Sequence, residues 1–152
     1  MTAGLHGSVQ ETSTILLVED NADDVDLVTY AFRKLGIRNP IAVVGDGDAA
    51  VAYIQGTGVY GDRARHPLPV LVLLDLKLPR RSGFEVLQEI RRESATRHTP
   101  VVVLTSSGQD ADVLRAYELT ANSYLVKPVS RDGLVAMLQS VQDYWIKLNR
   151  TV

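Results

Sequence analysis

Five short apolar runs alternate with longer segments in this chain, and this alternation constrains its fold more than any other feature of the sequence. The runs cover residues 15–18, 41–44, 70–74, 101–104 and 123–126. They are closer to continuous apolar stretches than to alternating ones, which is typical of parallel strands that are covered on both faces. We therefore predict five parallel strands.

The segments between the runs have the periodicity of helices. In the first segment the apolar residues recur at threes and fours and stop before Gly36, a candidate for the residue that ends a helix. Similar segments follow Asp46, Gly83 and Asp110, and the last helix is expected over about residues 132–149. Strict alternation of strand and helix predicts a doubly wound α/β fold with right-handed crossovers. The pattern alone leaves the order of the strands open.

The composition is that of one globular domain. The 152 residues include no cysteine, and the net charge of −2 gives no broad positive field for nucleic acid. The longest apolar run, residues 49–54, has six residues, far short of the roughly 18 that span a bilayer. We expect a leader at residues 1–13, a single domain at 14–149, a cytoplasmic location, and neither a nucleic-acid nor a membrane partner.

One glycine motif does not fit a cofactor site. The stretch GTGVYG at residues 56–61 has the spacing of a dinucleotide-binding loop, but it follows a helix where such a loop follows a strand. Because Pro67 and Pro69 come next, residues 56–69 are interpreted as a surface loop. The loop is long for a connection from a helix to a strand, and a partner contact is one hypothesis for it.

Charged and polar residues follow four of the five predicted strands. Glu19 and Asp20 follow the first strand, Asp75 the third, Thr105 the fourth and Lys127 the fifth. The carboxyl ends of parallel strands lie at one edge of the sheet, where such folds bind their ligands. We therefore expect three carboxylates, a hydroxyl group and an ammonium group to converge there.

Three neighbouring carboxylates repel one another, by about 1 kcal/mol per pair at about 4 Å in water and by about 4 kcal/mol at an effective dielectric constant of about 20. Either one acid is held protonated or a divalent cation lies among them. An oxygen-only cluster fits Mg²⁺ better than zinc. Mg²⁺ also orients phosphate, for which Lys127 and Thr105 supply donors. The interpretation is a nucleophilic attack by Asp75 on a phosphoryl group, with Glu19 and Asp20 holding the metal.

Four motifs resemble the receiver domain of two-component response regulators, over about residues 13–148. They are LLVEDN at 16–21, LLDLKLPRRSG at 73–83, VVVLTSS at 101–107 and SYLVKP at 123–128. The resemblance implies a flavodoxin-like fold with five helices and strand order 2-1-3-4-5. It implies a signalling protein that accepts a phosphoryl group from a histidine kinase and later loses it by its own hydrolysis, and no enzyme that acts on a separate substrate.

The resemblance also implies the residues of the metal site. Asp75 is the phosphoacceptor. Mg²⁺ is held by Asp20, by Asp75 and by the backbone carbonyl of Lys77, and Glu19 acts through water.

The roles of the remaining site residues follow from the same resemblance. Thr105 and Lys127 bind the phosphoryl oxygens, and the peptide bond between Lys127 and Pro128 is cis. Tyr124 is expected to be a switch residue that turns inward when Thr105 shifts toward the phosphoryl group.

The last helix is predicted to carry a dimer interface. No output domain is expected after residue 152, so the signal should leave through surfaces of this domain. Apolar residues on the helix follow a 4-3-4-3 spacing, which is typical of a contact between two helices. The predicted interface residues are Leu134, Leu138, Val141, Tyr144, Trp145 and Leu148.

The long loop and the aromatic last helix are similar to those of single-domain regulators that are paired with bacterial phytochromes. This similarity implies a light-sensing kinase as partner. One alternative is a receiver-like interaction module that accepts no phosphate, although all five site residues are present. Another is a phosphatase of the haloacid dehalogenase type, which needs an acid at the position of Lys77. A flavodoxin-like cofactor protein is disfavoured because acids follow the first strand in place of glycines.

Overall fold

Strand β1 (Ile15–Val18) is an interior strand of the sheet, and all four of its side chains are apolar and buried. In the computed structural model, which describes residues 12–150, β1 lies between β2 (Ile41–Val44) and β3 (Leu71–Leu74). Strands β4 (Val101–Thr105) and β5 (Ser123–Val126) complete a parallel sheet of order β2-β1-β3-β4-β5. The predicted α/β class, the five strands and the flavodoxin-like order are confirmed.

Within residues 12–150, five α-helices alternate with the strands. They are α1 (Ala22–Lys34), α2 (Gly47–Gln55), α3 (Gly83–Arg92), α4 (Asp110–Glu118) and α5 (Arg131–Val141). Four of them begin after a polar residue whose side chain accepts a hydrogen bond from an N–H group of the first turn, namely Asn21, Asp46, Ser82 and Ser130. Helix α1 ends where Gly36 takes a φ of 77°, as the sequence predicts.

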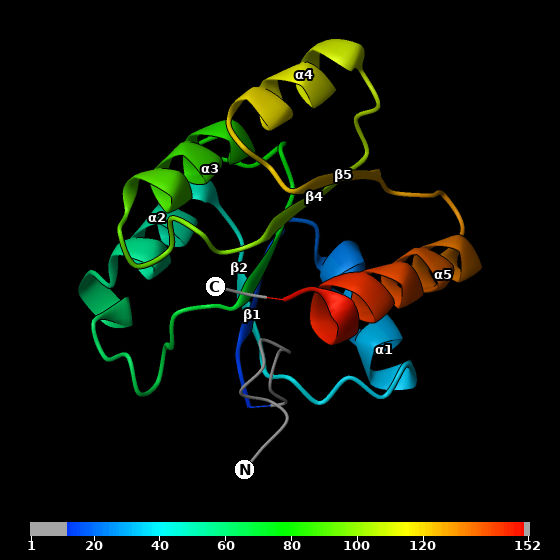
Figure 1. Cartoon of the computed structure of the whole chain (residues 1–152), viewed down its shortest axis with the longest axis horizontal. Helices are drawn as coiled ribbons and strands as arrows, with labels where there is room; N and C mark the ends of the chain where they lie inside the picture. The colour runs from blue at the N-terminus through cyan, green and yellow to red at the C-terminus, as the bar shows by residue number, and fades with distance from the viewer. Residues whose placement is uncertain (1–11, 151–152) are drawn as a thin grey trace.

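The helices cover the sheet in two layers (Figure 1). Helices α2, α3 and α4 pack on one face, where Leu16 and Val18 of β1 contribute to the core. Helices α1 and α5 pack on the other face, with Ile15 and Leu17. Burial of side chains of this size stabilises a fold by about 1.5–3 kcal/mol each. The continuous apolar strands therefore reflect a sheet with a core on each side.

The end of the chain differs from the prediction of one helix over residues 132–149. Helix α5 ends at Val141, and the chain continues as a π-helix, η3 (Gln142–Leu148). Gln142 and Ile146 are the buried residues of η3. They lie four positions apart, a spacing that both kinds of helix can present to a core, so the periodicity could not distinguish them.

The described residues contain no cis peptide bond, so the prediction of a cis bond between Lys127 and Pro128 was wrong. The backbone N–H of Lys127 donates to the carbonyl of Thr105 at 2.7 Å, which continues the pairing of β4 and β5 up to the proline. Most of the predicted leader, residues 1–11, lies outside the described residues. Within the described part of the chain, no helix is both long and apolar enough to cross a membrane.

Candidate functional site

Three carboxylates meet at the carboxyl edge of the sheet. Glu19 follows β1 and Asp75 follows β3, and both side chains are buried, whereas Asp20 is exposed. The backbone N–H of Asp75 donates to the carbonyl of Val18 at 3.0 Å, which fixes the two strand ends side by side. One oxygen of each carboxylate lies within 4.8 Å of the other two. The convergence that the sequence predicts is present.

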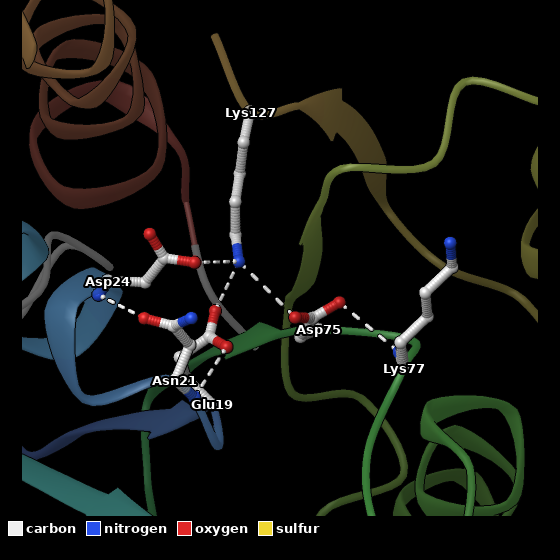
Figure 2. Close-up of polar contacts among 6 residues, drawn as sticks. All are labelled: Glu19, Asn21, Asp24, Asp75, Lys77 and Lys127. Atoms are coloured by element: carbon white, nitrogen blue, oxygen red, sulfur yellow. Dashed lines mark hydrogen bonds and ion pairs between the residues drawn. The ribbon is translucent and has the colours of Figure 1, made fainter. Parts of the chain in front are cut away.

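Lys127, which follows β5, contacts two of these acids, Glu19 and Asp75, and also Asp24 of α1. Its Nζ donates to Glu19 Oε1, to Asp24 Oδ2 at 2.9 Å and to Asp75 Oδ2 at 3.2 Å (Figure 2). The side chain of Lys127 is only 11% exposed. The ammonium therefore lies inside the site, between three carboxylates.

The charges of the site are not balanced. Burial raises the pKa of the Glu19 carboxyl to about 7, because contact with Lys127 offsets the loss of water only in part and the charge of Asp75 adds to the rise. Burial on its own lowers the pKa of Lys127, but the hydrogen bonds to Glu19 and Asp24 and the charge of Asp75 raise it above its ordinary value. One ammonium faces three carboxylates, so the site favours a further cation.

Thr105, at the end of β4, has an unpaired hydroxyl group. The residue is fully buried, and its Oγ1 has no hydrogen-bond partner in the described part of the chain. An unpaired buried polar group costs about 1–3 kcal/mol, so native structures rarely keep one without a reason. A ligand with an acceptor oxygen at this edge of the sheet would satisfy it.

Tyr124, on β5, connects the edge of the sheet to the segment before α4. Its hydroxyl donates to the carbonyl of Ser107 at 2.7 Å. The hydroxyl of Ser107 in turn donates to Asp112 Oδ2, on α4, at 2.6 Å. Burial raises the pKa of the Tyr124 phenol, so it remains a donor at neutral pH. The loop after Thr105 is therefore hydrogen-bonded both to Tyr124 of β5 and to Asp112 of α4.

Lys77 lies two residues after Asp75. Its backbone N–H donates to Asp75 Oδ1 at 3.2 Å, and its side chain is exposed and points away from the site (Figure 2). A lysine that points outward supplies no general acid next to Asp75. The haloacid dehalogenase alternative is therefore not supported by the geometry.

Asp24, in the first turn of α1, is a site residue that sequence reasoning missed. The residues predicted for the site directly follow the strands, whereas Asp24 lies four positions after Asp20, inside the next helix. The signal in the sequence was the second acidic pair, Asp23 and Asp24, which places a carboxylate at the helix start beside the site. Which of the two faces Lys127 depends on the helix phase, and the structure shows that it is Asp24.

A family model matches most of the chain. The response regulator receiver domain matches residues 15–139. The chain belongs to the response regulator receiver domain family. This confirms the resemblance that the four motifs carry and the function of a two-component response regulator.

Two curated relatives of this receiver domain match along most of their lengths. The probable methanogenesis regulatory protein FilR2 of Methanothrix harundinacea is 42% identical over 137 residues, which is 90% of this chain and 86% of FilR2. The response regulator Rcp1 of Synechocystis is 40% identical over 133 residues, 88% of each chain.

Solved structures agree with the fold of the receiver. The phosphorylated cyanobacterial phytochrome response regulator RcpA superposes with a TM-score of 0.86 at 32% identity, over 92% of this chain and 98% of RcpA. The Mn²⁺-bound form of Rcp1 superposes with a TM-score of 0.84 at 38% identity, over 92% of this chain and 99% of Rcp1. Both relatives are response regulators with a similar fold along nearly the whole chain.

In the receiver, the loop that follows β3 is hydrogen-bonded and ion-paired to the start of α2. The N–H of Gly47 donates to the carbonyl of Pro79 at 3.1 Å, and Arg81 forms an ion pair with Asp48 at 2.8 Å. A Cβ atom on Gly47 would lie 2.2 Å from the carbonyl oxygen of Arg81. Glycine is therefore required for this close approach. The contacts position the segment that includes Lys77.

Half of the predicted dimer interface lies inside the receiver. Leu134, Leu138 and Val141 are buried in the core cluster with α1 and the sheet. They were predicted to contact a second copy, and this must be corrected, because their side chains already pack within one chain. The 4-3-4-3 spacing describes a buried stripe as well as it describes a contact between chains. Tyr144 and Leu148 are exposed, and Trp145 is half-buried.

The loop at residues 56–69 has an arginine at its centre. Arg63 donates to the carbonyls of Tyr53 at 2.7 Å and Ile54 at 2.9 Å, which lie in the last turn of α2, and to that of His66 at 3.2 Å. A short 3₁₀ turn, η2 (Gly58–Tyr60), lies within the loop. The glycines are thus part of a compact surface loop and not of a phosphate-binding loop.

Proposed function

We propose that Asp75 accepts a phosphoryl group from the phosphohistidine of a sensor histidine kinase in a Mg²⁺-dependent reaction. The observation that carries the proposal is the buried, unpaired Oγ1 of Thr105 at the same sheet edge as Asp75 and Lys127. Together these residues offer a nucleophile, a hydroxyl donor and a cation. A phosphoryl group uses all three.

The transfer forms one bond and breaks another. A carboxylate oxygen of Asp75 bonds to phosphorus while the bond from phosphorus to the imidazole nitrogen of the kinase breaks, and the imidazole keeps the electron pair. Lys127 is already 3.2 Å from Asp75 Oδ2, where it can offset negative charge on the incoming group. The acyl phosphate is removed later by water, which restores the carboxylate.

The donor set fits a divalent metal ion. Glu19, Asp20 and Asp75 bring only oxygen atoms, within 4.8 Å of one another, and such ligands suit Mg²⁺ and Mn²⁺. Rcp1 has a Mn²⁺-bound form. We assign the site to Mg²⁺, with the backbone carbonyl of Lys77 as a further ligand and Glu19 acting through water. When bound, the metal neutralises the carboxylates and orients the phosphoryl oxygens.

Thr105 and Tyr124 form the proposed switch. When the hydroxyl of Thr105 binds a phosphoryl oxygen, the segment from Thr105 to Ser107 moves with it. The hydrogen bond from Tyr124 to Ser107 and the one from Ser107 to Asp112 carry this movement to β5 and α4. These surfaces then present the phosphorylated state to partners.

The relatives and the exposed residues of η3 support two proposed partners. Because RcpA is a phytochrome response regulator, we assign a phytochrome-type kinase as the phosphoryl donor.

We also propose a homodimer through η3, where the rings of Tyr144 and Trp145 pack edge to face at 4.8 Å and Leu148 is 75% exposed. An exposed apolar surface of this kind is covered in many assemblies.

Incubation with acetyl phosphate and Mg²⁺ tests the proposal. The native protein should gain the mass of one phosphoryl group, and the gain should disappear in Asp75→Asn and on removal of Mg²⁺ by a chelator. Asp110→Asn is the control, because this carboxylate is exposed at the start of α4 and lies outside the cluster of Glu19, Asp20 and Asp75. Equal labelling of native protein and Asp75→Asn would remove Asp75 from the mechanism.

A further inference from the structure

We propose that Asp24 is a positioning residue that holds the ammonium of Lys127 in the resting protein and releases it to the phosphoryl group. This inference rests on the proposed phosphorylation of Asp75. It assigns a role to a carboxylate outside the metal-binding cluster of Glu19, Asp20 and Asp75. The contact concerned is the ion pair of 2.9 Å between Lys127 Nζ and Asp24 Oδ2 (Figure 2).

The ammonium group of Lys127 has no free donor in the resting protein. An ammonium group has three N–H donors and no acceptor. Lys127 contacts three carboxylates, those of Glu19, Asp24 and Asp75. Each donor is therefore matched by one carboxylate. A hydrogen bond to a phosphoryl oxygen requires Lys127 to give up one of these contacts.

The three carboxylates that contact Lys127 differ in their exposure to water. The side chain of Glu19 is 3% exposed and that of Asp75 is 8% exposed, so either carboxylate would lose its partner where water has little access. The side chain of Asp24 is 34% exposed. Water can solvate it after release, and a partly exposed ion pair of this kind contributes little to stability. Asp24 is thus the partner that Lys127 leaves at the lowest cost.

Asp24 is the third residue of α1, which is capped by Asn21. An acidic residue at this third position often accepts a hydrogen bond from the backbone N–H of the capping residue. Here the N–H of Asn21 donates to Glu19 Oε2 at 3.2 Å, while the side chain of Asn21 accepts from the N–H of Asp24 at 3.0 Å. The Asp24 carboxylate is left to face Lys127. After release it remains at a helix N-terminus, which stabilises a negative charge.

Neutralisation of Asp24 should therefore favour the phosphorylated state. We would measure the affinity for beryllofluoride, a phosphoryl analogue, at saturating Mg²⁺ by calorimetry. Asp24→Asn should bind about three- to fivefold more tightly than the native protein, the range that an ion pair near 1 kcal/mol implies. Asp23→Asn is the matched control, because it removes the same charge from the same helix turn at an exposed residue. It should bind as the native protein does.

A second readout addresses the contact itself. In the protein without beryllofluoride, the hydrogen atoms on Lys127 Nζ should exchange with water faster in Asp24→Asn than in native protein or Asp23→Asn, as measured by ¹⁵N-lysine NMR. A merely structural role of Asp24 would not change this rate selectively. Thermal unfolding of both variants checks that the fold is intact.

The outcomes separate this inference from the proposed function. If the native protein binds no beryllofluoride, the phosphorylation proposal itself is overturned. If the native protein binds and Asp24→Asn binds equally or more weakly, only the role of Asp24 is overturned. The same holds if Asp23→Asn gains as much affinity, because the effect would then be one of general charge. Unchanged exchange at Lys127 in Asp24→Asn also overturns it.

Discussion

The phenol of Tyr124 donates a hydrogen bond to the carbonyl of Ser107, and the 2.7 Å contact joins the last strand of the sheet to the segment that follows Thr105. Ser107 is itself buried, and its hydroxyl donates to Asp112. Tyr124 is thus part of a hydrogen-bonded chain that extends from β5 to α4. Ser107, the middle residue of these hydrogen bonds, lies two residues after Thr105, the proposed ligand of the phosphoryl group.

Tyr124→Phe should loosen the segment before α4. The ring and its packing remain, but the hydrogen bond to Ser107 is lost, which should lower the free energy of unfolding by about 0.5–1.5 kcal/mol. Hydrogen exchange should become faster at the backbone amides of residues 106–110. Tyr117→Phe is the control, because this tyrosine of α4 is 48% exposed. Hydrogen exchange at residues 106–110 should be the same in Tyr117→Phe as in the native protein. Equal exchange in native protein and Tyr124→Phe would argue against a link between β5 and this segment.

Thr105→Val should separate stability from ligand binding. Valine replaces the unpaired Oγ1 with a methyl group, so the free energy of unfolding should stay within about 0.5 kcal/mol or rise, because no hydrogen bond is lost. Beryllofluoride affinity should fall about ten- to hundredfold, the cost of a lost hydrogen bond to a charged group.

Thr105→Ser provides the control for this prediction, since it keeps the hydroxyl and should retain most of the affinity. Urea denaturation and calorimetry give the two quantities. A clear loss of stability in Thr105→Val would show that the hydroxyl has a partner inside the resting protein, which would weaken the case for a ligand there.

Much of the site could be predicted from the sequence because parallel strands align their carboxyl ends. Once residues 15–18, 71–74 and 123–126 are recognised as strands, Glu19, Asp75 and Lys127 must lie at one edge. The alternation of strands and helices requires no knowledge of side-chain conformation. Strand order was not determined by the pattern and came from the resemblance to the receiver family.

Features that depend on the direction of a helix face could not be predicted in this way. Asp23 and Asp24 have the same chemistry, and only the phase of α1 selects the residue that meets Lys127. Likewise, the spacing of Leu134 and Leu138 shows that they share a stripe but not what covers it, and the stripe faces the core. Sequence periodicity defines a face, whereas packing decides its partner.

Gly47→Ala should disturb the loop after Asp75. The added Cβ would lie 2.2 Å from the carbonyl oxygen of Arg81, so the loop has to move, at a cost of about 1–3 kcal/mol in the free energy of unfolding. Because the loop includes Lys77, the affinity for Mg²⁺ should also fall.

Gly45→Ala is the matched control, since the nearest atom to its added Cβ is 3.9 Å away, an ordinary contact. Urea denaturation gives the stability, and a Mg²⁺ titration followed by NMR gives the affinity. If Gly47→Ala lost stability but kept the native Mg²⁺ affinity, the loop would not position the metal ligands.

Leu148→Lys should weaken the proposed homodimer without harm to the fold. Leu148 is 75% exposed, so a lysine there should change the free energy of unfolding by no more than about 0.5 kcal/mol. A charge at the centre of an apolar contact between two copies would be buried without a partner, so the apparent mass in sedimentation at micromolar concentration should fall toward that of one chain. Leu114→Lys, on α4, is the control because Leu114 is 62% exposed and lies on another helix. A fall in mass with Leu114→Lys alone would place the contact on α4, and an unchanged mass in Leu148→Lys would remove η3 from the interface.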